Sequence, residues 1–186
     1  MERRTVKASF TTREENEQKH IGGYYSVFDE LYEVMPGFME RIARHAFDDA
    51  LKGDIRVLWN HNSDIVLGRS TAGTATFGVD DHGLFSDTIV NEEDRTALDC
   101  HARINRGDVS QASFGFDILE ESWEWHDDGS CIRTIEKVKL YEVSPCTFPA
   151  YEGTDIKARA ADAKRAAQDF LDKKKERVKE RMNKWH

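Results

Sequence analysis

The chain has 186 residues, 39% of them hydrophobic, and a formal net charge of −8 at pH 7. This length suits one domain with a hydrophobic core, and no apolar run approaches the roughly 20 residues of a membrane-spanning helix, which excludes a transmembrane protein. Three cysteines without a Cys-x-x-Cys pair argue against a disulfide framework and a structural zinc site, and fit a reducing cytoplasm.

The first half of the chain predicts strands and one helix. Residues 1–19 are polar, without the apolar stretch of a secretory signal, and predict a first strand at best, followed by a mobile stretch. Residues 21–28 combine aromatic and β-branched side chains with two glycines, as in a strand that bends. Apolar residues at 38, 39, 42, 43, 46, 47, 50 and 51 have helical spacing, which predicts a helix over 38–51.

The second half predicts mostly strands. Short apolar runs between 56 and 90, separated by turn residues, indicate an antiparallel meander. A helix is expected over 92–105, ended by Gly107, and strands resume over 111–119, 123–126 and 131–148. Because an open sheet of this size leaves edges to protect, we expect a mainly β, α+β fold: a small closed antiparallel barrel of six to seven strands surrounded by helices.

The chain ends in a segment of different composition. Residues 157–184 hold 11 Lys and Arg against 5 Asp and Glu, which leaves 16 basic and 30 acidic residues elsewhere. The acidic remainder should repel nucleic acid, whereas the basic segment is a candidate attachment element. We expect a polar segment over 1–19, a core domain over 20–153 and a charged helix over 154–186, either docked or solvated and partly frayed.

Two residues are candidates for chemistry. His61 directly follows a predicted strand, where an imidazole is well placed as a general base, although a polar turn is an equal interpretation. Ser113 alternates with Phe114 and Phe116, so its hydroxyl lies on the other strand face, and Ala112 and Gly115 leave space for a substrate backbone. A strand serine whose hydroxyl is satisfied by the backbone is the alternative interpretation. The remaining histidines follow no metal-ligand pattern, so no metal or other cofactor is expected.

Several segments, in this order, resemble the prohead proteases of tailed bacteriophages. They are residues 21–28, 37–42 (GFMERI), 57–61 (VLWNH), 66–68 (VLG), 81–84 (DHGL), 106–108 (RGD), 112–116 (ASFGF), 142–145 (EVSP) and 148–151 (FPAY), which together cover about residues 20–152. The motifs are short, but their order and spacing carry the resemblance.

The resemblance implies a fold similar to that of the herpesvirus capsid-maturation protease and a catalytic triad. It assigns Ser113 as nucleophile, His61 as general base and Glu142 as the third member, which would orient the imidazole. The herpesvirus enzymes carry two arginines in the oxyanion-hole region; this chain has Pro149-Ala150-Tyr151 there, so we expect the Ala150 backbone N–H to donate. Asp64 and Asp117 are alternative partners for His61.

The expected function is a serine endopeptidase of procapsid maturation that needs no cofactor. The resemblance implies that its substrates are the major capsid protein with its scaffolding segment, or a separate scaffold protein, and its own chain, inside the procapsid in the host bacterial cytoplasm. The herpesvirus enzymes dimerise, which makes a homodimer a candidate here. Two alternatives stay open: Cys146 as a rival nucleophile, and a non-catalytic scaffold or capsid-interaction protein built on the same barrel.

Overall fold

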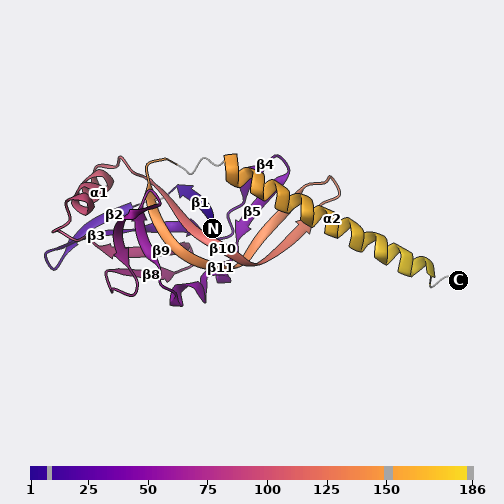
Figure 1. The fold of residues 1–186 in the computed structure, drawn as a ribbon, viewed down its shortest axis with the longest axis horizontal. Coiled ribbons are helices and arrows are strands. Elements are labelled where there is room, and N and C mark those ends of the chain that lie inside the picture. The colour runs from indigo at the N-terminus through magenta and orange to yellow at the C-terminus, as the bar shows by residue number, and fades with distance from the viewer. Residues whose placement is uncertain (8–9, 149–152, 184–186) are drawn as a thin grey trace.

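The computed structural model describes residues 1–7, 10–148 and 153–183. Figure 1 labels most of its elements. In chain order these are β1 (Glu2–Lys7), β2 (Phe10–Glu15), β3 (Gln18–Val27), β4 (Tyr32–Met35), β5 (Phe38–Ile42), two 3-10 helices (Arg44–Phe47 and Ala50–Lys52), β6 (Arg56–Trp59), β7 (Asn62–Arg69), β8 (Ala75–Val79), β9 (Gly83–Ile89), α1 (Arg95–Arg106), β10 (Gln111–Trp125), β11 (Cys131–Cys146) and α2 (Gly153–Asn183).

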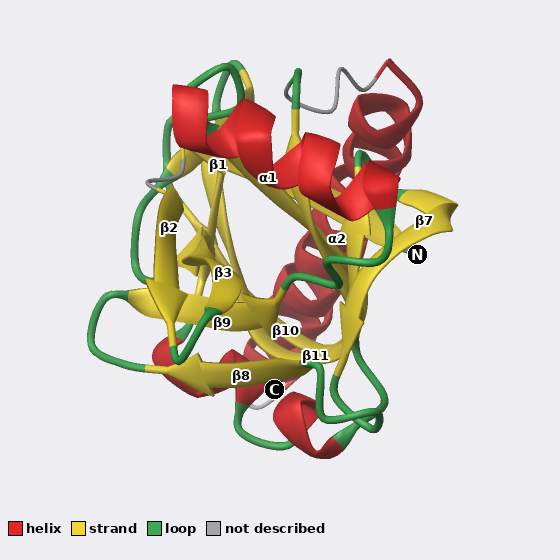
Figure 2. Ribbon diagram, turned by 90° about the vertical axis from the view of Figure 1, so that its left-hand side faces the viewer, coloured by secondary structure: helices red, strands yellow, loops and turns green. Residues whose placement is uncertain are grey.

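The strands form two sheets (Figure 2). The larger has the order β1-β10-β11-β5-β4, with β6 added to β11 and β7 to β6, and the smaller has the order β2-β3-β9-β8. β10 and β11 form a long antiparallel hairpin, and the other edge of β11 is shared by β5 toward its start and by β6 toward its end, both in parallel. The last part of β11 therefore lies between β10 on one edge and the β6–β7 hairpin on the other.

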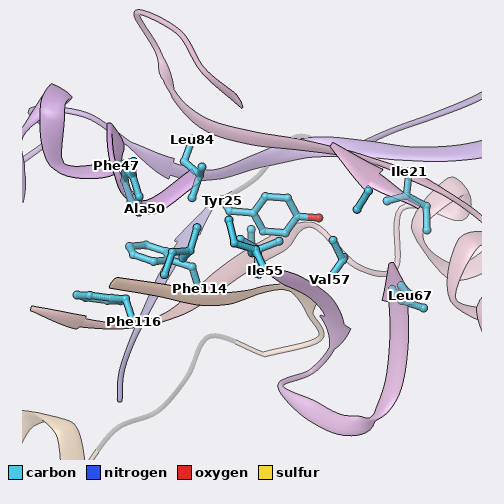
Figure 3. Packing of buried hydrophobic residues seen from close by; sticks show 14 of the residues in the cluster. Ile21, Tyr25, Phe47, Ala50, Ile55, Val57, Leu67, Leu84, Phe114 and Phe116 are labelled. Atoms are coloured by element: carbon cyan, nitrogen blue, oxygen red, sulfur yellow. The ribbon is translucent and has the colours of Figure 1, made fainter. Parts of the chain in front are cut away.

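The core lies between the strands of the two sheets. Figure 3 shows Phe114 and Phe116 of β10 among the core residues, with Tyr25 of β3 pointing toward Val57 of β6. Tyr25, Phe114 and Phe116 are fully buried, and each buried aromatic side chain contributes about 1.5–3 kcal/mol through the removal of apolar surface from water. This packing fixes the core face of β10 and leaves its other face for the polar residues discussed below.

The strand-rich α+β class is confirmed, but the expected closed barrel is not found among the described residues. Their strands pair in two separate sheets, and β11 pairs with β5 and β6 in parallel rather than antiparallel fashion. The predicted α-helix ending at Gly107 is confirmed as α1. Asp94 caps its start by accepting a hydrogen bond from the Thr96 N–H (2.8 Å), and Gly107 closes it with a left-handed backbone, φ +87°.

The predicted helix over 38–51 is wrong. This stretch forms strand β5 and two short 3-10 helices. Along β5 the buried positions alternate, Phe38, Glu40 and Ile42, as in a strand. Glu40 is completely buried because Arg4 of β1 and Arg133 of β11 (3.3 Å) both pair with it, and periodicity of apolar residues alone does not reveal such a buried carboxylate.

The N-terminal segment also differs from its prediction. Within residues 1–19 the structure describes two strands: β1 pairs with β10 along its whole length, and β2 pairs with β3. Arg4 is buried in its pair with Glu40, and Phe10 packs on the core. The polar composition of this segment is therefore compatible with ordered edge strands.

Helix α2 lies along the far end of the β10–β11 hairpin and then projects beyond it (Figure 1). Ala163 packs on a small second cluster of Val34, Phe38 and Cys131, and the Phe170 ring stacks on Trp125 with centroids 5.9 Å apart. The predicted charged helix thus docks through Ala163 and Phe170, near its middle. Of the helices in the part of the chain that is described, none is long and apolar enough to cross a membrane.

Candidate active site

His61 stands in a two-residue turn between β6 and β7. Asn60 and His61 both have left-handed backbones, with φ of 52° and 60°, as the tight turn of a twisted hairpin requires. Asn60 is held against the end of β11: its N–H donates to the Pro145 carbonyl (3.1 Å), and its side chain exchanges hydrogen bonds with Thr147. Left-handed backbone is uncommon for residues other than glycine, so the contacts of Asn60 with β11 help to hold the turn that carries His61.

The His61 ring is paired with Glu142 of β11. Nδ1 of His61 lies 2.6 Å from Oε1 of Glu142, and the two side chains are 7% and 5% exposed. The other carboxylate oxygen accepts a hydrogen bond from the Ser144 hydroxyl (2.6 Å), and the Ser144 oxygen accepts one from the His61 backbone N–H (3.1 Å). The imidazole, the carboxylate and the hydroxyl therefore form one closed, buried network.

Ser113 lies beside this network. It is the cross-strand partner of Ser144 in the β10–β11 ladder, and directly opposed residues have Cβ atoms about 4.5–5.5 Å apart on the same sheet face. Ser113 is fully buried. Its Oγ and the Nε2 of His61, the ring nitrogen that Glu142 does not engage, both lack a hydrogen-bond partner among the residues that the structure describes.

Gly115 makes room for the carboxylate. It opposes Glu142 in the ladder, and a Cβ added there would overlap Oε1 of Glu142. Immediately before Glu142, β11 carries one extra residue, Tyr141, a bulge of the kind that re-aims side chains near active sites. The sequence-based expectation that Gly115 leaves space for a substrate backbone is therefore wrong, because the Glu142 side chain fills that space.

The alternative partners of His61 have other contacts. Asp117 accepts a hydrogen bond from the Tyr141 hydroxyl (2.7 Å), whose donation lowers the pKa of the carboxyl. Asp64 is exposed, and its backbone N–H donates to the Asn62 side chain (2.9 Å). Of the three carboxylates considered from the sequence, Glu142 is the one paired with His61 in the structure.

Cys146 is a poor nucleophile in this environment. It is 2% exposed, and burial, assisted by the charge of Glu142, raises the pKa of its thiol to about 12. Only the thiolate is reactive, so Cys146 is inert near neutral pH.

Ala150, the expected oxyanion-hole donor, lies outside the described residues. Within the described ranges, no three His, Cys, Asp or Glu residues come together as a metal site would require.

Ser144 was missed by the sequence analysis, although a signal for it exists. Residues two apart on a strand share a face. Once Glu142 was assigned to the site, the sequence therefore already indicated that Ser144 lies beside it. Its distance in sequence from His61, 83 residues, hides the backbone contact that joins them.

Comparison with known proteins supplies one match. The model of a family described as caudovirus prohead serine protease matches residues 7–169, which is most of the chain and includes all the site residues described above. No curated protein and no solved structure matches the chain.

Proposed function

Because the chain belongs to the caudovirus prohead serine proteases, we propose that it is a serine endopeptidase of phage capsid maturation whose nucleophile is Ser113. His61 is its general base, and Glu142 orients the base. The observation that carries the proposal is the 2.6 Å contact between His61 Nδ1 and Glu142, beside a buried serine whose hydroxyl has no partner in the described structure.

The chemistry follows from the positions of the protons. Glu142 accepts a hydrogen bond from the Nδ1–H of His61, which keeps the proton of the neutral ring on Nδ1 and leaves the Nε2 lone pair free to receive a proton. As Ser113 Oγ bonds to the peptide carbonyl carbon, its proton passes to Nε2, and the Glu142 carboxylate stabilises the resulting imidazolium. His61 then protonates the departing amine, and water hydrolyses the acyl-enzyme by the same transfers.

The tetrahedral intermediate also needs donors for its oxyanion. We keep the Ala150 backbone N–H as the proposed donor, because Pro149 has no N–H to give. The test is a crystal structure of the enzyme with an acyl group bound to Ser113. If the carbonyl oxygen of that acyl group receives no hydrogen bond from the backbone N–H of residue 150, this assignment is wrong.

Ser113 is fully buried in this conformation, so a peptide must displace the groups that cover it before its carbonyl reaches Oγ. Such a closed resting state suits an enzyme whose cleavage waits until assembly concentrates its partners.

We propose as substrates the scaffold or the scaffolding segment of the major capsid protein, and the chain itself, inside the procapsid in the host cytoplasm. The basic segment over 157–184 is the proposed attachment element.

The direct test is a co-expression of the phage's capsid and scaffold proteins with wild-type chain or with Ser113→Ala. Wild type should yield shortened products on a gel, with new termini identified by mass spectrometry, and Ser113→Ala should yield none. Ser122→Ala, which removes an exposed hydroxyl from the same strand, is the matched control and should process normally. Identical products with Ser113→Ala would favour a non-catalytic scaffold protein instead.

A further inference from the structure

We propose that Ser144 is a positioning residue of the catalytic site: its hydroxyl holds both the backbone of His61 and the carboxylate of Glu142. This inference rests on the proposed function. The triad implied by the family resemblance contains no member at this position, and the assignment comes from the contacts around the Ser144 oxygen.

The hydroxyl links the two residues in a defined direction. It accepts from the His61 backbone N–H (3.1 Å) and donates to Oε2 of Glu142 (2.6 Å), which leaves Oε1 to face Nδ1 of His61. A carboxylate with one oxygen fixed cannot rotate its other oxygen away from the ring. A hydroxyl that donates to a carboxylate forms a strong hydrogen bond, so this contact holds the Glu142 carboxylate in place.

The same hydroxyl supports an unfavourable backbone. His61 has a left-handed φ of 60°, and its N–H points into the protein rather than to solvent. A buried N–H without an acceptor is costly, so the loss of the Ser144 oxygen would free the turn to relax and carry the imidazole with it. Ser144 is completely buried, so water does not readily replace it.

The chain contains an exposed counterpart of this network. On the same hairpin, the Ser122 hydroxyl donates to Glu136 (2.6 Å), and the other oxygen of Glu136 lies 3.0 Å from Nε2 of His45. The side chains of His45 and Glu136 are 62% and 28% exposed, so water competes for each contact. Ser122 therefore provides a control with the same chemical groups in a solvated setting.

The experiment compares full-length wild type, Ser144→Ala, Ser144→Thr and Ser122→Ala with two measurements. The first is the rate constant for labelling of Ser113 by a fluorophosphonate, a reaction in which Oγ bonds to phosphorus, fluoride leaves and the proton passes to His61. The second is the proton NMR signal of the Nδ1–H of His61, which shifts far downfield when it donates to a carboxylate. Thermal unfolding reports the folded fraction of each variant.

We expect Ser144→Ala to label about 10- to 100-fold more slowly, the effect of losing a hydrogen bond to a charged group, and to lose the downfield signal. Threonine keeps the hydroxyl and should restore both within about threefold, and Ser122→Ala should match wild type. If threonine does not fold, Ser144→Cys replaces it, with a rate expected between wild type and alanine, since a thiol is a weaker donor.

The outcomes separate the two proposals. A Ser144→Ala variant that is less stable but keeps the labelling rate and the NMR signal would show a merely structural serine and overturn the inference. A rescue variant no faster than alanine would also count against it. Wild type that is never labelled at Ser113, together with unprocessed capsid protein in the co-expression, would instead refute the protease assignment, whatever Ser144 does to the His61 signal.

Discussion

Replacement of Glu142 by glutamine tests the proposed role of the carboxylate at nearly constant shape. The amide has two orientations in the network. With its oxygen toward His61 Nδ1 and its NH₂ toward Ser144, the tautomer of the imidazole is kept but the negative charge is lost. With its NH₂ toward Nδ1, the ring must accept there, and the proton moves to Nε2, where it blocks the base.

The expected loss of rate follows from these two cases. A carboxylate about 4 Å from a developing imidazolium, at an effective dielectric constant of about 20, contributes about 4 kcal/mol, which is roughly three factors of ten in rate. The wrong tautomer costs about 10⁴-fold in a serine protease triad. We therefore expect Glu142→Gln to slow Ser113 labelling and capsid processing by about 10³- to 10⁴-fold.

The control is Glu136→Gln, because Glu136 has the same two kinds of partner, a serine hydroxyl and a histidine ring, at the surface. That variant should stay within about twofold of wild type, since exposed pairs contribute little. Urea unfolding of both variants checks that the comparison concerns folded protein. A Glu142→Gln rate within a few-fold of wild type would remove Glu142 from the triad.

Three further predictions concern the surroundings of the site. Gly115→Ala should push the Glu142 carboxylate off His61, because the new Cβ overlaps Oε1, and slow Ser113 labelling by about 10- to 100-fold; wild-type labelling would refute this. Because burial raises its thiol pKa to about 12, native Cys146 stays protonated at pH 8 and should resist iodoacetamide until the chain unfolds, and rapid alkylation would contradict the burial. Phe170→Ala removes the ring stacked on Trp125, so amides of α2 should exchange faster with deuterium while those of β10 do not change; equal protection of α2 would argue against docking through this contact.

Local patterns in the sequence were sufficient for some elements. The start and end of α1 are set by residues within one turn of it, Asp94 and Gly107, so the prediction needed no distant partner. The short alternation over residues 113–116 likewise placed Phe114 and Phe116 on the core face, opposite Ser113. Such features depend on neighbours in the chain, which the sequence displays directly.

Other elements depended on partners far away in sequence. β5 has apolar spacing compatible with a helix, and it became a strand because it pairs with β11 and buries Glu40 between two arginines. The two-sheet arrangement has the same origin. The outer edge of β11 pairs with both β5 and β6, which lie about 90 residues before it in the chain. No local pattern encodes these pairings.

The sequence by itself determined which residues are available for the chemistry: a histidine after a strand, a serine among small and aromatic residues, and a glutamate on a late strand. Only the tertiary structure decided how they meet. The β10–β11 register sets Ser113 opposite Ser144, and the strained turn at His61 docks on the same hydroxyl that fixes Glu142. The reason is physical: a proton transfer requires atoms within hydrogen-bond distance, and that distance is set by strand pairing and packing across more than 80 residues of chain.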